Sequence, residues 1–264
     1  MMNEVVIKRS KLSIFCTNIV LSALAFGLIG GIFSEQAWTS EWTYSGEKGP
    51  KNWTEISPET IACGGSQQSP IAINSATAVK VNSQNLLLKW KPFHPFVMDN
   101  GHSIGAMVNG LGGYALFDET RYNLVQFHFH HGSEHTVDNK RYQAEAHFVH
   151  QSKIGDLMVV GVFIEEGESN SLIEKMWTSL PEGKGSKEMP YTISLHDLLP
   201  EDNSYYRYQG SLTTPGCFEI VTWHILEQPV TMSKRQIAAM ANRYENNYRP
   251  TQSINRRYVL KGGE

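Results

Sequence analysis

The chain has 264 residues, of which 41% are hydrophobic and 19% are charged, and its formal net charge is −3 at pH 7. The first 33 residues carry one Glu and three Lys or Arg side chains, a net charge of +2, so the rest of the chain carries about −5. This acidic balance argues against nucleic-acid binding. The roughly 230 residues after this leader show no linker or repeat and are expected to form a single domain with a sizeable core.

Residues 1–33 have the pattern of a secretory signal peptide. Lys8, Arg9 and Lys11 precede an almost uncharged apolar run from Leu12 to Phe33, which is a basic region followed by a hydrophobic one. We expect cleavage between residues 31 and 37, which would deliver residues 38–264 to the periplasm or the outside of the cell. Because roughly 20 apolar residues can also span a bilayer, an uncleaved membrane anchor is the alternative.

Short apolar runs predict a mainly β architecture for residues 38–264. LLLKW at 86–90, GGYALFD at 112–118 and DLMVVGVFI at 156–164 have strand lengths and strand composition. Gly and Pro are frequent, with 22 and 11 residues. Helices are therefore expected to be short, and residues 233–244 are the best candidate.

Residues 126–150 hold six of the ten histidines. Val125, Phe127 and Phe129 alternate with Gln126, His128 and His130, the two-residue period of a strand, so His128 and His130 point to one face. By the same period Glu145, His147 and Val149 share a face of a second strand. The polar residues 132–141 between them predict an antiparallel hairpin that places His147 beside the first two histidines.

Three neutral imidazoles without a fourth protein ligand are typical of a catalytic zinc site, which leaves one tetrahedral position to water. The alternative is a group of hydrogen-bonded core histidines or a polar sheet face. His131 and His150 fall on the opposite strand face and His135 falls in the connection. We therefore expect structural roles for these three.

The motifs QFHFH, GSEHT and AEAHFVH, followed by GSLTTP, resemble the α-class carbonic anhydrases, and the resemblance runs from Trp42 to Arg256. It implies an α+β, mainly β fold with a large, mostly antiparallel central sheet and short peripheral helices. It also implies reversible hydration of carbon dioxide to bicarbonate and a proton by zinc-bound hydroxide. Sulfonamides and anions are the expected inhibitors, the same hydroxide could hydrolyse activated esters, and analogy with bacterial members allows a homodimer.

The resemblance assigns roles to individual residues. His102 would be the proton shuttle, Thr213 would donate to Glu134 and orient the hydroxide, and Tyr44 would contact the water network of the site. The residues expected to support the zinc ligands are Gln126, Glu145 and Asn247, the last through its backbone carbonyl to His130. The residues expected to line the pocket for carbon dioxide are Val149, Val159, Leu212, Thr214, Val221 and Trp223.

Cys63 and Cys217 remain once the leader is removed, and two cysteines in an exported chain are most simply a disulfide. The family often has Cys at these two places, and two buried free thiols are the alternative. A rival function is a binding module that keeps the family's fold without its chemistry. Such relatives typically lack a zinc-binding histidine, whereas His128, His130 and His147 are all present here.

Overall fold

The computed structural model describes residues 42–82, 86–108 and 110–263, which belong to the compact unit Thr39–Glu264. The predicted signal peptide lies outside the described residues. Among the described residues, no helix combines the length and the apolar character needed to cross a membrane.

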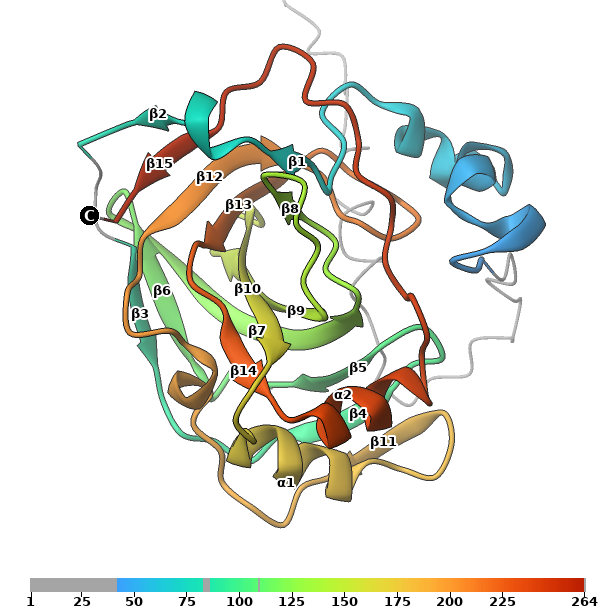
Figure 1. Ribbon diagram of the computed structural model, residues 1–264, viewed down its shortest axis with the longest axis vertical. Helices are drawn as coiled ribbons and strands as arrows, with labels where there is room; N and C mark the ends of the chain where they lie inside the picture. The colour runs from blue at the N-terminus through green and yellow to red at the C-terminus, as the bar shows by residue number, and fades with distance from the viewer. Residues whose placement is uncertain (1–41, 83–85, 109, 264) are drawn as a thin grey trace, which may run out of the picture. The chain divides into compact units, whose positions relative to one another are not determined.

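Most of the described elements are strands, as the sequence predicted (Figure 1). The strands are β1 Ala72–Ile73, β2 Val79–Lys80, β3 Leu87–Trp90, β4 Phe96–Asp99, β5 Ile104–Met107, β6 Gly113–Phe117, β7 Thr120–His131, β8 Thr136–Val137, β9 Ala144–Ser152, β10 Leu157–Glu166, β11 Gly185–Glu188, β12 Tyr205–Gly210, β13 Val221–Leu226, β14 Val230–Met232 and β15 Leu260–Gly262. The α-helices are α1 Ser171–Ser179 and α2 Lys234–Ala241, and the 3-10 helices are η1 Gly46–Lys48, η2 Pro50–Glu55, η3 Pro58–Gly64, η4 Ser75–Thr77 and η5 Leu195–Leu198.

Thirteen of the described strands form one sheet in the order β11-β4-β5-β7-β9-β10-β13-β12-β15-β2, with β14 beside β10, β6 beside β7 and β3 beside β6. The pairs β10–β13, β10–β14 and β15–β2 are parallel, and the other pairs of this sheet are antiparallel. β1 and β8 form a separate parallel pair. The predicted fold class, a mostly antiparallel central sheet with short peripheral helices, is confirmed.

The predicted hairpin consists of β7 and β9, and its register pairs His128 directly with His147. The alternation expected on β7 breaks at Val125, because the register shifts between Leu124 and Gln126. Leu124 rather than Val125 therefore joins Phe127 in the core. A bulge of this kind adds one residue to a strand and changes which side chains share a face. The connection also contains β8, which the sequence analysis did not predict.

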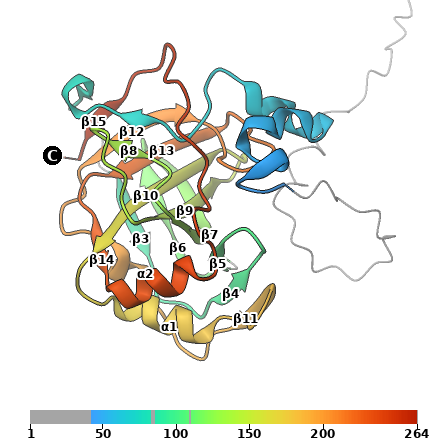
Figure 2. The same cartoon turned by 45° about the vertical axis from the view of Figure 1, so that its right-hand side comes forward.

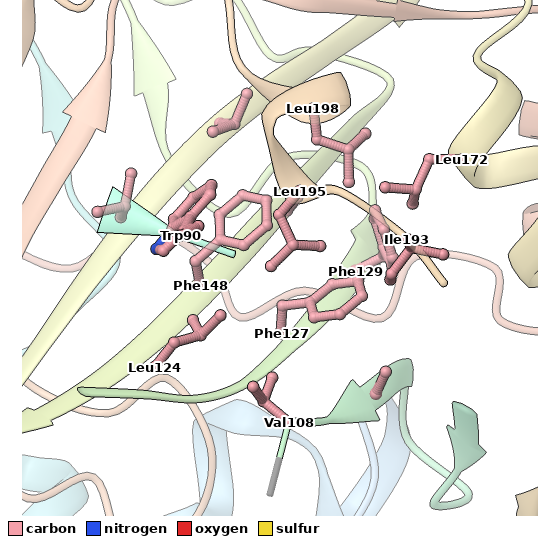
Figure 3. Close-up of a cluster of buried hydrophobic side chains, with 14 of the residues drawn as sticks. Trp90, Val108, Leu124, Phe127, Phe129, Phe148, Leu172, Ile193, Leu195 and Leu198 are labelled. Carbon is pink, nitrogen blue, oxygen red and sulfur yellow. The ribbon is translucent and has the colours of Figure 1, made fainter. Parts of the chain in front are cut away.

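The buried apolar residues of the described chain gather mainly in two clusters on opposite faces of the sheet. The larger cluster includes Phe127, Phe148 and Leu172 of α1 (Figure 3). Met240 of α2 also belongs to it. The second cluster includes Val149 and lies on the face toward which His147 points, since successive strand residues alternate between faces. His147 therefore lies on one face of the sheet, whereas the other face packs against α1 and α2 (Figure 2).

Both helices begin with a side-chain cap. Ser233 accepts a hydrogen bond from the Gln236 amide at the start of α2, which lies within the predicted range 233–244. Asn170 caps α1 by accepting from the amides of Leu172 and Ile173. α1 was not predicted, although its capping Asn and its apolar residues at helical spacing are helix signals in the sequence.

Candidate active site

The histidines that the sequence analysis placed on one face, His128, His130 and His147, converge in the structure. One ligand nitrogen from each lies within 4.8 Å of the others. Their ring centroids are separated by 5.0 Å for His128 and His130, 5.2 Å for His128 and His147, and 4.7 Å for His130 and His147. The two central strands of the sheet hold all three rings, so the geometry comes from paired backbone and not from a loop.

Each of the three imidazoles is oriented by a hydrogen bond from one of its ring nitrogens. Nδ1 of His128 donates to Oε1 of Gln126 at 2.9 Å, and Nδ1 of His130 donates to the Asn247 carbonyl at 2.7 Å. Nε2 of His147 donates to Oε1 of Glu145 at 2.8 Å. The three acceptors are the residues that the sequence analysis expected. These bonds place a proton on one nitrogen of each ring and leave the other nitrogen as a lone-pair donor.

The environment favours neutral imidazoles. Burial lowers the pKa of His128 well below its usual range, and the neighbouring His130 and His147 lower it further. Burial also lowers the pKa of His130, despite the opposing effect of Glu134. Nε2 of His130 is buried and has no hydrogen-bond partner among the described residues. Three imidazole nitrogens, one of them buried and unpaired, fit a metal ion that keeps a coordination position open.

Glu145 is itself held by His135, a residue to which the sequence analysis gave only a structural role. Nδ1 and the backbone amide of His135 donate to Oε1 and Oε2 of Glu145 at 2.8 and 2.9 Å. Nε2 of His135 lies 2.7 Å from the hydroxyl of Tyr208, which donates to Ser69. Although burial acts to raise the pKa of Glu145, His135 and His147 hold it well below its usual value.

Glu134 is fully buried beside the histidine triad. Its Oε1 accepts from the Arg249 amide at 2.7 Å. Its Oε2 lies 3.6 Å from Nε2 of His130 and 3.9 Å from Nδ1 of His147, and has no hydrogen-bond partner among the described residues. The predicted hydrogen bond from Thr213 to Glu134 is therefore not formed in the structure, because this oxygen faces the imidazoles.

The predicted apolar wall lies on neighbouring strands of the same face as His147. Val159 on β10 pairs with Val149 on β9 and with Trp223 on β13, and the Trp223 ring centroid is 4.8 Å from that of His147. Val221 belongs to the same buried cluster, and Leu212 packs against it. The structure thus brings these five predicted residues together.

The loop after β12 carries Thr213 and Thr214 and is tied to the N-terminal part of the described chain. Thr213 is buried, and the Thr214 carbonyl accepts from the Cys217 amide at 2.9 Å. Cys217 forms a disulfide with Cys63 of η3, so the predicted bridge is present in the structure. It joins residues 154 positions apart.

His102 and Tyr44 come from segments that precede the strands of the histidine triad in the chain. His102 lies in the turn between β4 and β5, and its ring stacks on Trp42 with a centroid distance of 3.8 Å. The Tyr44 hydroxyl is buried without a partner among the described residues, and its pKa is raised well above the usual value by burial and by the charge of Glu134.

Comparison with known proteins agrees with this arrangement. The family model for eukaryotic-type carbonic anhydrase matches residues 48–262. A carbonic anhydrase of Nostoc sp. is 34% identical over 254 residues, which cover 92% of this chain and 96% of that protein. The α-carbonic anhydrase of Thermovibrio ammonificans, solved with the inhibitor sulfanilamide, is 43% identical with a TM-score of 0.81, covering 83% of this chain and 98% of that one.

A solved structure of dioscorin complexed with ascorbate is also similar, with 27% identity, a TM-score of 0.80 and coverage of 85% of this chain and 98% of that one. Fold similarity alone therefore does not decide the function. The family match and the sequence identity to named enzymes show the family. The chain belongs to the eukaryotic-type, or α-class, carbonic anhydrases. The family's activity is hydration of carbon dioxide, so the chain is a carbonic anhydrase and a lyase.

Proposed function

We propose that the chain hydrates carbon dioxide reversibly to bicarbonate and a proton, with zinc held by His128, His130 and His147. The observation that supports this most directly is the convergence of three ligand nitrogens within 4.8 Å, one of them the buried and unpaired Nε2 of His130. Imidazole nitrogen is a common protein ligand for zinc. Bound zinc would supply the Lewis acidity that makes hydroxide available from water near neutral pH.

We assign orientation of the nucleophile to Thr213 and Glu134. A threonine hydroxyl has one proton and two acceptor sites, so a carboxylate that accepts the proton leaves the oxygen free to accept from the nucleophile. Oε2 of Glu134 is buried and accepts no hydrogen bond from the described residues, so it remains available to accept the Thr213 proton when the nucleophile is bound. Thr213 is the hydroxyl to which we give that role.

We assign binding of carbon dioxide to the apolar wall beside His147. Val149, Val159 and Trp223 are at most 5% exposed; the two valines have no polar group, and the Trp223 indole N–H already donates to the Ser211 carbonyl at 3.0 Å. An apolar wall also suits an uncharged substrate better than its charged product, which favours release of bicarbonate into water. Leu212 and Val221 extend this wall, and Thr214 lies in the adjoining loop.

We assign proton export to His102. Its turn is only partly buried, and imidazole is the side chain suited to exchanging protons with buffer near neutral pH. Tyr44, whose buried hydroxyl has no protein partner among the described residues, would help to order water between the triad and His102.

Further properties belong to the same proposal. Sulfanilamide is an inhibitor in complex with the similar enzyme of Thermovibrio ammonificans, so we expect sulfonamides and small anions to inhibit this enzyme as well, and activated esters to be slow substrates. The leader pattern supports export to the periplasm or the medium, with residues 38–264 as a single catalytic domain. A homodimer is an expectation from analogy.

The mechanism is tested by steady-state hydration at low and high buffer for wild type, His102→Ala and Thr213→Ala. His102→Ala should lose turnover at low buffer and regain much of it with added imidazole, because a diffusing base replaces the tethered one. Thr213→Ala should lose activity that no buffer restores, because orientation is lost. Equal turnover of His102→Ala and wild type at low buffer would remove His102 from the mechanism. Zinc-loaded protein without sulfonamide-sensitive hydration would favour the binding-module alternative.

A further inference from the structure

Two side chains at the start of the turn that carries His102, those of Asp99 and Asn100, hold its backbone by hydrogen bonds. Asp99, the last residue of β4, is 4% exposed, and its Oδ1 accepts from the Gly101 amide at 3.0 Å. Oδ1 of Asn100 accepts from the amides of His102 and Ser103, both at 2.8 Å. The position of Asp99 therefore sets the path of the backbone that presents His102.

Asp99 is in turn bonded to the segment that follows α2. Nε of Arg243 donates to Oδ2 of Asp99 at 2.8 Å, and the Tyr244 hydroxyl donates to Oδ1. Arg243 also donates to the Pro181 carbonyl through Nη2. Burial acts to raise the pKa of Asp99, but hydrogen bonds from Tyr244 and Gly101 and the charge of Arg243 hold it below its usual value. Asp99 is thus an ionised carboxylate with a fixed orientation.

The segment that follows α2 is also hydrogen-bonded to β7, the strand that carries His128 and His130. Nδ2 of Asn247 donates to the His102 carbonyl at 2.8 Å, while its own carbonyl accepts from Nδ1 of His130 at 2.7 Å. Its Oδ1 accepts from the His131 amide at 2.6 Å. Residues 243–247 therefore connect the turn of His102 to β7, and Figure 1 shows the end of α2 beside β4 and β5.

We infer that Arg243 and Tyr244 are positioning residues for proton export: through Asp99 they hold the turn of His102 at a set separation from the histidine triad. The inference rests on the proposed role of His102. Proton transfer across water depends on the placement of the acceptor, so a turn that moves by a fraction of an ångström slows transfer without changing the site where carbon dioxide reacts. Stacking on Trp42 restricts the ring of His102. The backbone of His102 is positioned instead by the hydrogen bonds described above.

The test compares Arg243→Gln and Tyr244→Phe with Arg235→Gln in the zinc-loaded full-length enzyme. Arg235 is a matched control, because it also pairs with a carboxylate, Glu174 at 2.6 Å, but on the exposed side of α2. At low buffer the two test variants should lose about fivefold in kcat. Their kcat/KM should stay within about a factor of two of wild type, because the proton leaves after the attack on carbon dioxide. Added imidazole should restore their kcat, and Arg235→Gln should match wild type throughout.

A second measurement reads the turn directly. Amide hydrogen exchange of Gly101, His102 and Ser103 should be faster in Arg243→Gln than in wild type or in Arg235→Gln. Unchanged kcat in both test variants, or equal losses in kcat and kcat/KM, would overturn the inference. If His102→Ala slows turnover and the test variants do not, only this inference fails. If His102→Ala itself turns over like wild type, the proposed shuttle fails and this inference fails with it.

Discussion

Two buried histidines outside the active site, His150 and His224, are placed where protonation is unfavourable. His150 accepts a hydrogen bond from Nε1 of Trp90 at 2.9 Å, and burial lowers its pKa to about 4. His224 lies between Phe117 and Tyr205, with ring centroids at 4.5 and 4.9 Å, and neither of its ring nitrogens has a partner among the described residues. Burial, with smaller contributions from Arg207 and His150, lowers the pKa of His224 to about 3.

The two histidines should make the fold sensitive to acid. In the unfolded chain both take up protons below their ordinary pKa of 6.5, whereas in the folded chain both stay neutral until pH 4 or 3. The unfolded state therefore binds more protons as the pH falls below 6.5, and at about pH 5 each histidine should have lowered the free energy of unfolding by on the order of 2 kcal/mol.

His224→Leu removes one of these groups and keeps an apolar side chain in its place. The difference in unfolding free energy between about pH 7.5 and pH 5, measured by urea titration, should be smaller in the variant by on the order of 2 kcal/mol. His94→Leu, at an exposed histidine, is the control and should behave as wild type. The same pH dependence in His224→Leu and wild type would show that His224 binds a proton as readily in the folded chain as in the unfolded one.

Glu145 would act on the proposed zinc through its hydrogen bond to His147. Replacing it by Gln removes the charge that both His147 and His135 contact at 2.8 Å while keeping the shape. We expect zinc affinity to fall by about tenfold to a hundredfold, because such partners orient the ligand and increase its basicity. Competition with a chromophoric chelator measures the affinity. Glu165→Gln, which removes an exposed carboxylate paired with Lys140, should leave it unchanged, and equal affinities in all three proteins would refute the role.

At the scale of elements, the disulfide joins η3 to the loop that carries Thr213 and Thr214. Closing a loop of 154 residues restricts the unfolded chain, and replacing both Cys63 and Cys217 by Ala should lower the free energy of unfolding by about 2–5 kcal/mol. Urea titration of wild type and of the double variant gives this difference. Thiol titration of denatured, unreduced protein that has lost the leader should find no free thiol, and two free thiols in such protein from its native compartment would contradict the bridge.

Local patterns in the sequence predicted some elements and missed others. The two-residue period was enough to place His128, His130 and His147 on one sheet face. It was not enough to find the bulge at Val125, because a bulge changes the period at one residue and leaves composition unaltered. The strand β8 was missed because two residues carry too little periodic signal, and its partner β1 lies more than 60 residues earlier.

For the whole molecule, the site depends on contacts between residues that are far apart in the chain. The carbonyl that orients His130 belongs to Asn247, 117 residues later, and Tyr208 meets His135 across 73 residues. No local period predicts such pairs. The resemblance to a family supplied Asn247 and the apolar wall, whereas the contacts of His135, Asp99 and Arg243 emerged only from the structure.

The two faces of the sheet have different roles: one packs the large hydrophobic core, and the other carries the histidine triad. The large cluster under α1 and α2 contains Phe148, which neighbours His147 in sequence but points to the opposite face. Because side chains on the two faces do not share a cavity, changes in this cluster should affect stability more than catalysis. The histidine triad instead shares its face with Val149 and Trp223, so the proposed zinc site and the proposed substrate wall are supported by neighbouring strands of one sheet.

The central claim, a zinc site made by three strand histidines that hydrates carbon dioxide, is tested most directly by measuring zinc content and hydration rate together. Wild type and the exposed control His94→Ala should each bind one zinc per chain and hydrate carbon dioxide at the same rate. His147→Ala should lose most of its zinc and nearly all of its activity, because two imidazoles do not complete the site. Full zinc content and full hydration activity in folded His147→Ala would contradict the account.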